Sequence, residues 1–379
     1  MKKTVGILFG GKSAEHEISI LSAKNIYEAI DKEKFEPVLI GISKSGHWVL
    51  DDAPRFLLNA GNPALISLNT TAGSPAADET AVSQTGKHGI LSETDKIFST
   101  VHLDVVFPIL HGPFGEDGTI QGLLKLAAIP FVGPGVLGSA VGMDKDVMKR
   151  LLREAGIPIG RFIAIKSREK APSFSEVTAA LGSPVFIKPA NMGSSVGINK
   201  VRNQEEYLHA LNDAFQYDTK IVVEEFIPGR EIECAVLGNE DPIASVPGEI
   251  IPTHEFYSYD AKYLDENGAS LQIPAQLDAE TAKRVQELAI KTFQTLCCEG
   301  LSRVDFFLKE DGGLIVNEIN TMPGFTRISM YPKMWETPQN GNSFSYTGLI
   351  TRLIELAIAR FEKEQMLKTG LASGNPVGA

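Results

Sequence analysis

The pattern at the start of the chain restricts the fold most strongly. The apolar run from Val5 to Phe9 ends at two glycines, and apolar residues at helical spacing then follow as far as Ile30. A second apolar run covers residues 38–42. A strand, a glycine turn, a helix and a second strand in this order are typical of a parallel α/β unit. The sequence therefore predicts an N-terminal domain with a parallel sheet.

Three domains are expected in all, because a chain of 379 residues is too long for one small core. We place an α/β domain at 1–142, a small α+β unit of short strands and helices at 143–228, and a third mixed domain at 229–369. Residues 51–96 are rich in Gly, Pro, Ala, Ser and Thr without a period, and they predict an insertion with long loops. Residues 370–379 predict a flexible tail.

Composition argues against several partners and locations. The chain has 36 Lys and Arg against 47 Asp and Glu, a formal net charge of −11, which disfavours nucleic acid or an anionic membrane as the main partner. No apolar run approaches the length of a membrane span, and the run after Met1 is too short for an export signal. The three cysteines, with Cys297 and Cys298 adjacent, indicate thiols in a reducing compartment, so a cytoplasmic location is expected.

Two strands near the end of the chain carry polar residues in alternation with apolar ones. Arg303 and Asp305 share one face of the first strand, and Glu318 and Asn320 share one face of the second. The turn at 310–313 should fold the strands into a hairpin, with Asp305 roughly opposite Glu318. These oxygen ligands suit magnesium shared with phosphates. A solvated sheet face is the alternative, but the apolar neighbours indicate buried strands, where unpaired acids are unfavourable.

A loop rich in glycine and serine, residues 191–197, lies between two predicted strands and follows Lys188. Its glycines would let backbone N–H groups converge on an anion, and the lysine would add positive charge. An ordinary hairpin loop is the alternative when the segment is taken alone. No Gly-Lys-Ser/Thr run opens a helix here, so the loop is not a Walker A motif.

Other polar segments are predicted to border the same site. Glu15 and His111 each follow a strand of the N-terminal domain, and in a parallel sheet both loops lie at the carboxyl edge, where ligands bind. Glu15 could hold an ammonium or cap the helix. The Pro-Gly turn at 323–324 could offer N–H groups to an oxyanion, with Ser329 as a donor to a carboxylate; a plain loop remains open. The bend at 224–231 suits a nucleotide base and ribose, or a domain linker.

Six segments together resemble the ATP-grasp superfamily and, within it, the D-alanine–D-alanine ligases. The resemblance extends from Val5 to about Ala357 without the insertion, and the motifs occur in the family's order. The matching strings are FGGKSAEHEIS (9–19), LHGPFGEDG (110–118), GMDK (142–145), KPANMGSSVG (188–197), YDAKY (259–263) and NEINTMPGFT (317–326).

The resemblance implies a three-domain ATP-grasp architecture. It also implies ATP-dependent joining of two D-alanines through a D-alanyl phosphate, with release of ADP and phosphate, for peptidoglycan precursors. ATP and two Mg²⁺ ions are the implied cofactors, with Mn²⁺ as a substitute, and a homodimer is implied. An acyl phosphate hydrolyses in water, so a closing lid is expected, and the polar, aromatic stretch at 252–272 fits that role.

The resemblance also implies roles for individual residues. Those implied to contact ATP are Lys145, Lys188, Ser194, Ser195, Glu224, Glu225, Phe226, Ile227, Glu231, Lys262, Asn317 and Glu318. Those implied to bind magnesium are Asp305, Glu318 and Asn320. Those implied in catalysis are Glu15, Ser194, Tyr263, Arg303 and Gly324. Those implied to seat the amino acids are Glu15, His111, Ser329 and Met330.

Departures from the family pattern are small, and three other interpretations remain. Glu225 stands where many members have lysine and Met330 where many have leucine, and main-chain contacts could serve at both positions. A D-alanine–D-lactate ligase is the nearest alternative, although Tyr263 argues against it. Another ATP-grasp carboxylate–amine ligase is the second. A nucleotide-binding regulator is the third, but it would have little need for the polar hairpin.

Overall fold

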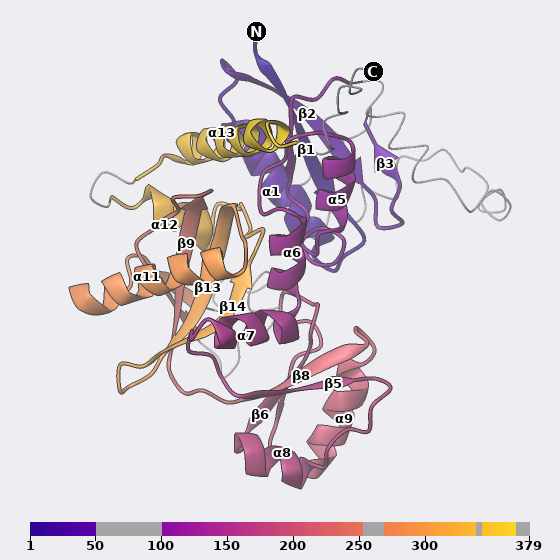
Figure 1. Cartoon of the computed structure of the whole chain (residues 1–379), viewed down its shortest axis with the longest axis vertical. Coiled ribbons are helices and arrows are strands. Elements are labelled where there is room, and N and C mark those ends of the chain that lie inside the picture. Colours follow the sequence, from indigo (N-terminus) through magenta and orange to yellow (C-terminus); the bar gives the residue numbers. More distant parts are fainter. Residues whose placement is uncertain (51–100, 253–268, 339–342, 369–379) are drawn as a thin grey trace, which may run out of the picture.

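The computed structural model describes residues 1–50, 101–252, 269–338 and 343–368. The predicted insertion, the predicted tail, Lys262 and Tyr263 lie outside these ranges. Figure 1 shows three sheets in succession, from the N-terminal domain at the top to the central unit at the bottom. Within the described residues, no helix is long and apolar enough to cross a membrane.

The N-terminal sheet is mostly parallel, as predicted. Its strand order is β3-β2-β1-β4; β1 pairs in parallel with β2 and β4, and the short β3 is antiparallel to β2. The elements are β1 (Lys3–Gly10), α1 (His16–Ala29), β2 (Phe35–Ile42), β3 (Trp48–Val49), β4 (Val105–Pro108), α5 (Thr119–Leu126) and α6 (Val136–Met143).

The helix α7 (Lys145–Glu154) leads into a central antiparallel sheet. Asp144 caps this helix, because its side chain accepts hydrogen bonds from the backbone N–H groups of Asp146 at 3.1 Å and Val147 at 3.0 Å. The sheet has the strand order β5-β8-β6-β7. Its elements are β5 (Phe162–Lys166), α8 (Phe174–Leu181), β6 (Val185–Pro189), β7 (Asn199–Val201), α9 (Gln204–Ala214) and β8 (Lys220–Glu225).

The third sheet is antiparallel, with the order β12-β11-β9-β13-β14 and β10 beside β9. Its strands are β9 (Arg230–Gly238), β10 (Ile243–Ala244), β11 (Gly248–Pro252), β12 (Ala269–Gln272), β13 (Gly300–Leu308) and β14 (Leu314–Asn320). Its helices are α11 (Ala279–Thr295), α12 (Met330–Glu336) and α13 (Tyr346–Gln365). The two ends of the predicted lid therefore lie in the paired strands β11 and β12, while residues 253–268 lie outside the description. Helix α12 was not predicted from the sequence.

One hydrophobic core joins the first and third domains. It contains Phe107 of β4, Leu237 of β9, Trp335 of α12 and Leu353 of α13, all of them buried. Figure 1 shows α13 beside α1 and the N-terminal sheet. The last helix of the chain thus returns to the first domain, which brings the carboxyl edge of the parallel sheet close to the third domain.

Arg360 holds helix α13 against the first domain. It is buried on α13, and its guanidinium donates to the backbone carbonyls of Gly133 at 2.5 Å and Phe131 at 2.8 Å. The guanidinium also lies 4.7 Å from the ring centroid of Phe131, and burial lowers the pKa of Arg360. The side chain therefore stabilises the contact between the two domains by satisfying two carbonyls that water does not reach.

Replacing Arg360 should weaken this contact. Arg360→Met should lower the free energy of unfolding by about 2–3 kcal/mol, because two buried carbonyls lose their charged donors. Arg352→Met, at an exposed ion pair on the same helix, should change it by less than about 0.5 kcal/mol. Urea unfolding of both variants measures the difference, and equal effects would show that the Arg360 contacts contribute little.

Candidate active site

A cavity of about 500 Å³ lies where the three domains meet. Twelve predicted site residues line it: Glu15, His111, Ser194, Glu231, Arg303, Asp305, Asn317, Glu318, Asn320, Gly324, Ser329 and Met330. Seven others lie outside its lining: Lys145, Lys188, Ser195, Glu224, Glu225, Phe226 and Ile227. The structure thus brings together polar residues from loops and strands far apart in the sequence.

The predicted hairpin forms with the predicted register. β13 and β14 pair antiparallel, with Asp305 opposite Glu318 and Arg303 opposite Asn320. The Arg303 guanidinium holds both oxygens of Asp305, with Nε to Oδ1 at 2.7 Å and Nη2 to Oδ2 at 2.8 Å. The Asn320 amide lies 2.9 Å from Asp305 Oδ2. Asp305 and Asn320 are therefore in contact, and Glu318, two residues before Asn320 on β14, lies opposite Asp305.

Glu233 is a further acid at this site that the sequence reasoning missed. It lies on β9, on the other side of β13, directly opposite Asp305. Its carboxylate is buried and lies 3.0 Å from Arg303 Nε. The alternation of Glu231 and Glu233 with apolar neighbours was the available signal, and it is the same signal that identified Asp305.

These oxygens fit the predicted metal by their chemistry. Two carboxylates and an amide oxygen are hard ligands suited to Mg²⁺. Glu233 adds a third acid beside them; the Arg303 guanidinium contacts Asp305 and Glu233, and the Lys145 ammonium lies near Glu318. In the described part of the chain, no three His, Cys, Asp or Glu side chains by themselves come together as a metal site. The amide of Asn320 is therefore needed to complete the set.

Two lysines share one buried carboxylate in the central unit. Glu224 Oε2 lies 2.6 Å from Lys188 Nζ, and Oε1 lies 3.2 Å from Lys149 Nζ. Burial alone would raise the pKa of Glu224, but the two ammonium groups outweigh it and lower that pKa. Burial likewise opposes the charge on Lys188, yet Glu224 and Glu318 raise its pKa. The pairing therefore keeps the Lys188 ammonium charged in a site with little water.

Lys149 was not predicted. It stands four residues after Lys145 on α7, so the two side chains lie on the same side of that helix. This spacing was the signal that could have identified it. Burial lowers its pKa, and the Glu224 carboxylate acts in the opposite direction.

The glycine-serine loop reaches toward the N-terminal domain. Lys145 Nζ donates to the Met192 carbonyl at 2.7 Å and lies 3.5 Å from Glu318 Oε2. Ser194 and Ser195 have φ of 49° and 61°, a left-handed conformation that is uncommon for residues other than glycine. The Ser194 hydroxyl donates to the Glu15 carboxylate. Ser194 and Glu15, both implied in catalysis by the resemblance, are therefore in contact.

His111, Glu116 and Glu15 are three buried groups at the carboxyl edge of the parallel sheet. His111 Nδ1 is 3.1 Å from the Met322 carbonyl, and burial lowers the pKa of this histidine. Glu116 accepts hydrogen bonds from the backbone N–H of Gly112 at 2.6 Å and of Met322 at 3.1 Å. Burial first, and then the charge of Glu15, raises the pKa of Glu116 to about 8. Glu116 thus links the first domain to the loop that follows β14.

The backbone next to Gly324 is held from three sides. The Phe325 N–H donates to Ser22 Oγ at 3.2 Å, and the Phe325 carbonyl accepts from Asn25 Nδ2 at 3.2 Å and the Tyr346 hydroxyl at 2.5 Å. Gly324 leaves little room for a side chain, because an added Cβ would lie 3.0 Å from Ser329 Oγ. The turn predicted to face an oxyanion therefore has a fixed position.

The bend after β8 has its side chains engaged elsewhere. Glu225 accepts from the Arg161 backbone N–H and from its guanidinium Nε, both at 2.7 Å. Phe226 is 41% exposed, with the Lys200 ammonium 4.7 Å from its ring centroid. The Glu225 backbone N–H also donates to the Arg161 carbonyl at 3.1 Å, so Arg161 engages both the side chain and the N–H of Glu225.

The arrangement matches the needs of phosphoryl transfer to a carboxylate. Such a transfer requires cations and N–H groups for the phosphates and hard oxygen ligands for metal ions, within a site where three domains restrict water. A cavity of this kind between two antiparallel sheets and a parallel one defines an ATP-grasp enzyme, an ATP-dependent carboxylate–amine ligase. Comparison with known proteins identifies the family.

Residues 4–134 match the family described as D-ala D-ala ligase N-terminus, and residues 151–355 match D-ala D-ala ligase C-terminus. The chain is 53% identical to the D-alanine–D-alanine ligase of Oceanobacillus iheyensis over 99% of this chain and 100% of that protein. It is 51% identical to D-alanine–D-alanine ligase A of Escherichia coli K12 over 97% of this chain and 99% of that protein.

Solved structures of D-alanine ligases are similar to this chain. The D-alanine–D-alanine ligase of Coxiella burnetii is 36% identical with a TM-score of 0.77, covering 96% of this chain and 98% of that one. The VanG D-Ala:D-Ser ligase of Enterococcus faecalis is 35% identical with a TM-score of 0.75, covering 94% and 100%. The chain belongs to the D-alanine–D-alanine ligase family, which catalyses ATP-dependent ligation of D-alanine for peptidoglycan synthesis.

The raised pKa of Glu116 predicts a dependence of stability on pH. Its usual pKa of 4.5 rises to about 8 in the folded protein, so folding favours the protonated carboxyl. The stability that this proton contributes is complete below the unfolded pKa and is lost as the pH rises through the folded pKa.

Glu116→Gln should remove this dependence, because the amide has no proton to lose. The free energy of unfolding of wild type relative to Glu116→Gln should fall between pH of about 5 and about 8 and then level off. Urea unfolding across this range measures it. Curves that stay parallel would show that Glu116 does not retain its proton in the fold.

Proposed function

We propose that this chain joins two D-alanines in the cavity between its three domains. ATP phosphorylates the carboxylate of the first D-alanine, and the amine of the second attacks the acyl phosphate and expels phosphate. The observation that carries the proposal is one cavity in which Glu15, the Ser194 loop and the Arg303–Asp305 strand face one another. Each part meets one requirement of that reaction.

The amino-acid groups are proposed to lie against residues of the first and third domains. Glu15, fixed by Ser194, offers a carboxylate to the ammonium of the first D-alanine. Arg303 and the Gly324 N–H would stabilise the tetrahedral oxyanion. Ser329 and Met330 would seat the second carboxylate, and His111 borders the first substrate. Tyr263 and Lys262 are proposed to complete the site from outside the described residues.

The nucleotide is proposed to lie against the central unit. Lys145, Lys188 and the Ser194–Ser195 loop would contact its phosphates. The segment 224–227 with Glu231, and Asn317, would hold its base and ribose. Support comes from the buried Lys188–Glu224 pair and from the Lys145 contact to Met192, which hold both ammonium groups next to the loop.

Asp305, Glu318 and Asn320 are proposed to hold two Mg²⁺ ions, for which Mn²⁺ is a substitute. When bound, the ions would offset negative charge on the transferring phosphoryl group. The donor set supports this, since the three side chains stand on one strand pair beside a third acid, Glu233.

The domain division at 1–142, 143–228 and 229–369, a cytoplasmic location, a homodimer and a lid at 252–272 are also proposed. The three separate sheets support the division, although α13 of the third unit shares a core with the first. The location rests on the three cysteines, the lid on the polar, aromatic character of its segment, and the homodimer on the resemblance to the family.

The reaction itself provides the first test. Protein with ATP, Mg²⁺ and D-alanine should form ADP, phosphate and D-alanyl-D-alanine in equal amounts, whereas L-alanine should give none. D-serine and D-lactate offered with D-alanine test the second substrate, since the attacking group of the proposed substrate is an amine. Mainly D-alanyl-D-lactate or D-alanyl-D-serine at neutral pH would contradict the D-alanine assignment and leave the ATP-dependent activation intact.

The proposed metal ligands provide the second test. Glu318→Gln should lower kcat by about 10³-fold, because a metal contributes several kcal/mol of charge stabilisation in the transition state. Glu310→Gln, in the exposed turn of the same hairpin, is the matched control and should keep the wild-type rate. Both should unfold at the wild-type temperature. A Glu318→Gln variant with near-normal turnover would exclude Glu318 from the metal site.

A further inference from the structure

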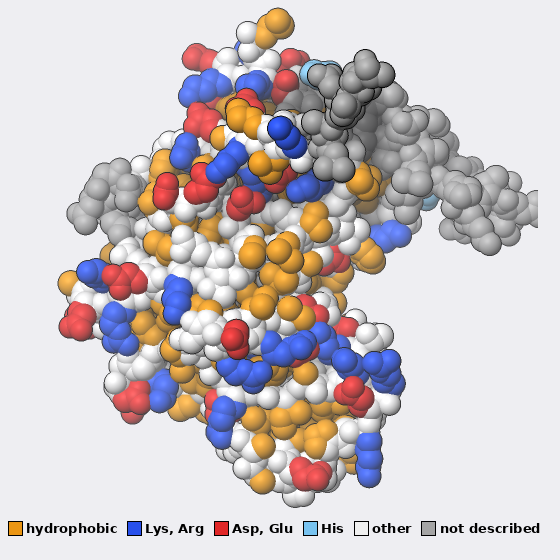
Figure 2. Space-filling model, viewed as in Figure 1, with side chains coloured by type: hydrophobic (Ala, Val, Ile, Leu, Met, Phe, Trp, Pro, Cys, Tyr) orange, Lys and Arg blue, Asp and Glu red, His pale blue; other side chains and the backbone are white. Residues whose placement is uncertain are grey.

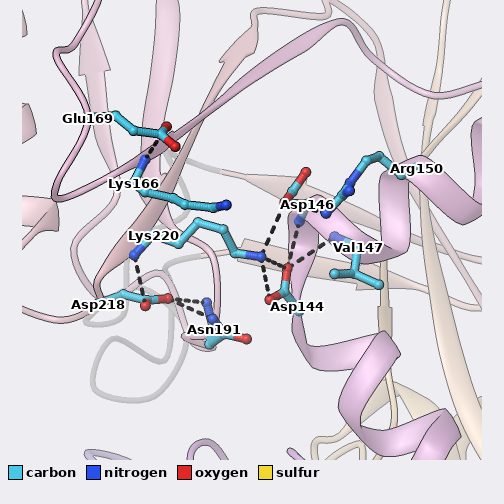
Figure 3. A network of polar contacts seen from close by, with 9 residues as sticks. All are labelled: Asp144, Asp146, Val147, Arg150, Lys166, Glu169, Asn191, Asp218 and Lys220. Carbon is cyan, nitrogen blue, oxygen red and sulfur yellow. Dashed lines mark hydrogen bonds and ion pairs between the residues drawn. The ribbon is translucent and has the colours of Figure 1, made fainter.

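A lysine outside the cavity lies between two acids at the start of α7. Figure 3 shows the Lys220 side chain extending from β8 to Asp144 and Asp146. Its Nζ is 2.7 Å from Asp144 Oδ1, 2.6 Å from Asp144 Oδ2 and 3.2 Å from Asp146 Oδ2. The side chain is only 15% exposed, so these ion pairs are largely protected from water.

Asp144 has a second task in the same place. Its Oδ1 also accepts the backbone N–H groups of Asp146 and Val147, which cap the helix. Two carboxylates two residues apart repel each other, and Lys220 offsets that repulsion by contacting both. Arg150 also reaches Asp146, at 2.8 Å, but its side chain is 56% exposed. Lys220 is therefore the less exposed of the two cations, and it fixes Asp144 at the helix start.

The segment that carries Lys220 also holds the entrance of the glycine-serine loop. The Lys220 carbonyl accepts the Ala190 N–H at 2.9 Å. Asp218 Oδ2 accepts the Asn191 backbone N–H at 2.8 Å and its side-chain amide at 2.9 Å, while Oδ1 accepts the Lys220 N–H at 3.1 Å. Figure 3 shows the contacts of Asp218 continuing through Lys220 to Asp144 and Asp146. Residues 218–220 thus hold the loop at its first residue.

The network adjoins Lys145, which contacts the phosphates in the proposed function. Lys145 directly follows Asp144, and its backbone N–H donates to the Ala190 carbonyl at 3.0 Å. Its ammonium donates to Met192, two residues before Ser194. Neither Lys220 nor Asp218 is among the described residues that line the cavity. Their contacts reach the site only through Lys145 and the loop.

We propose that Lys220 and Asp218 are positioning residues, which set Lys145 and the 191–197 loop at the distance needed to hold the phosphates of ATP. The inference rests on the proposed function, because it takes Lys145 and the loop as the phosphate contacts. Figure 2 shows Lys and Arg side chains gathered at the level of α7 and β5. Lys220 differs from an exposed cation in having two carboxylates within 3.2 Å.

Lys166 supplies the matched control. It is directly opposite Lys220 on the neighbouring strand, and Figure 3 shows its ammonium apart from both acids. Lys166 is exposed. Lys220→Met and Lys166→Met therefore remove the same charge from adjacent positions, and only the first removes the contacts to Asp144 and Asp146.

Steady-state kinetics test the proposal. Lys220→Met should raise the KM for ATP about tenfold or more, because a displacement of about 1 Å in a positioning element weakens the fit of the phosphates. The KM for D-alanine should stay within about twofold. Lys220→Arg should restore most of the affinity for ATP, since a guanidinium can contact both carboxylates. Lys166→Met should behave as wild type.

A thermal-shift measurement separates positioning from folding. The rise in melting temperature on adding the non-hydrolysable analogue AMP-PNP with Mg²⁺ should be smaller for Lys220→Met than for wild type. Asp218→Asn should show the same loss, because an amide nitrogen would meet the N–H groups that the carboxylate now accepts. If Lys220→Met does not fold, Asp218→Asn and Lys220→Arg decide the matter by the same two measurements.

The outcomes distinguish this inference from the proposed function. If wild type neither binds the analogue nor forms ADP, the proposed function fails. If wild type is active but Lys220→Met or Asp218→Asn keeps the wild-type KM for ATP and thermal shift, the positioning role alone is wrong. The same holds if the KM values for ATP and D-alanine rise equally together with a loss of folded protein.

Discussion

The rest of the structure depends on one constraint, which is that buried charges must be paired where the three domains meet. Glu224 lies between two ammonium groups, and Arg303 lies between Asp305 and Glu233. An unpaired charge in these positions would be strongly unfavourable, so each pair also fixes the strand or helix that carries it. The polar groups that a phosphate would contact are therefore already in place.

Buried backbone groups also need hydrogen-bond partners, and this need explains why the C-terminal helix returns to the first domain. The turn after β14 needs partners for its backbone, and α1 and α13 provide them through Ser22, Asn25 and Tyr346 at Phe325. Arg360 then satisfies carbonyls near the end of the first domain. The shared apolar core and these hydrogen bonds act together, because the first brings the backbones close and the second sets their alignment.

Local sequence patterns were sufficient to predict most of the helices and strands and the β13–β14 hairpin. The pairing of Asp305 with Glu318 followed from strand alternation and a turn. Asp144 caps its helix through backbone groups two and three residues further along the chain. Glu233 and Lys149 were missed because their partners are distant in sequence and the pairing is set by tertiary contacts. Helix α12 was missed because proline generally disfavours a helix, although Pro332 lies near the start of α12, where proline is tolerated.

The two acids at the carboxyl edge of the parallel sheet show how burial can assign different tasks to like groups. Glu116 is held between two backbone N–H groups and away from water, and its pKa rises to about 8. At neutral pH it is then mostly uncharged and serves as a link between domains. Glu15 accepts a hydrogen bond from Ser194 and is the carboxylate proposed to hold the ammonium of the first D-alanine. Two ionised carboxylates there would repel each other and loosen the contact between the first and third domains.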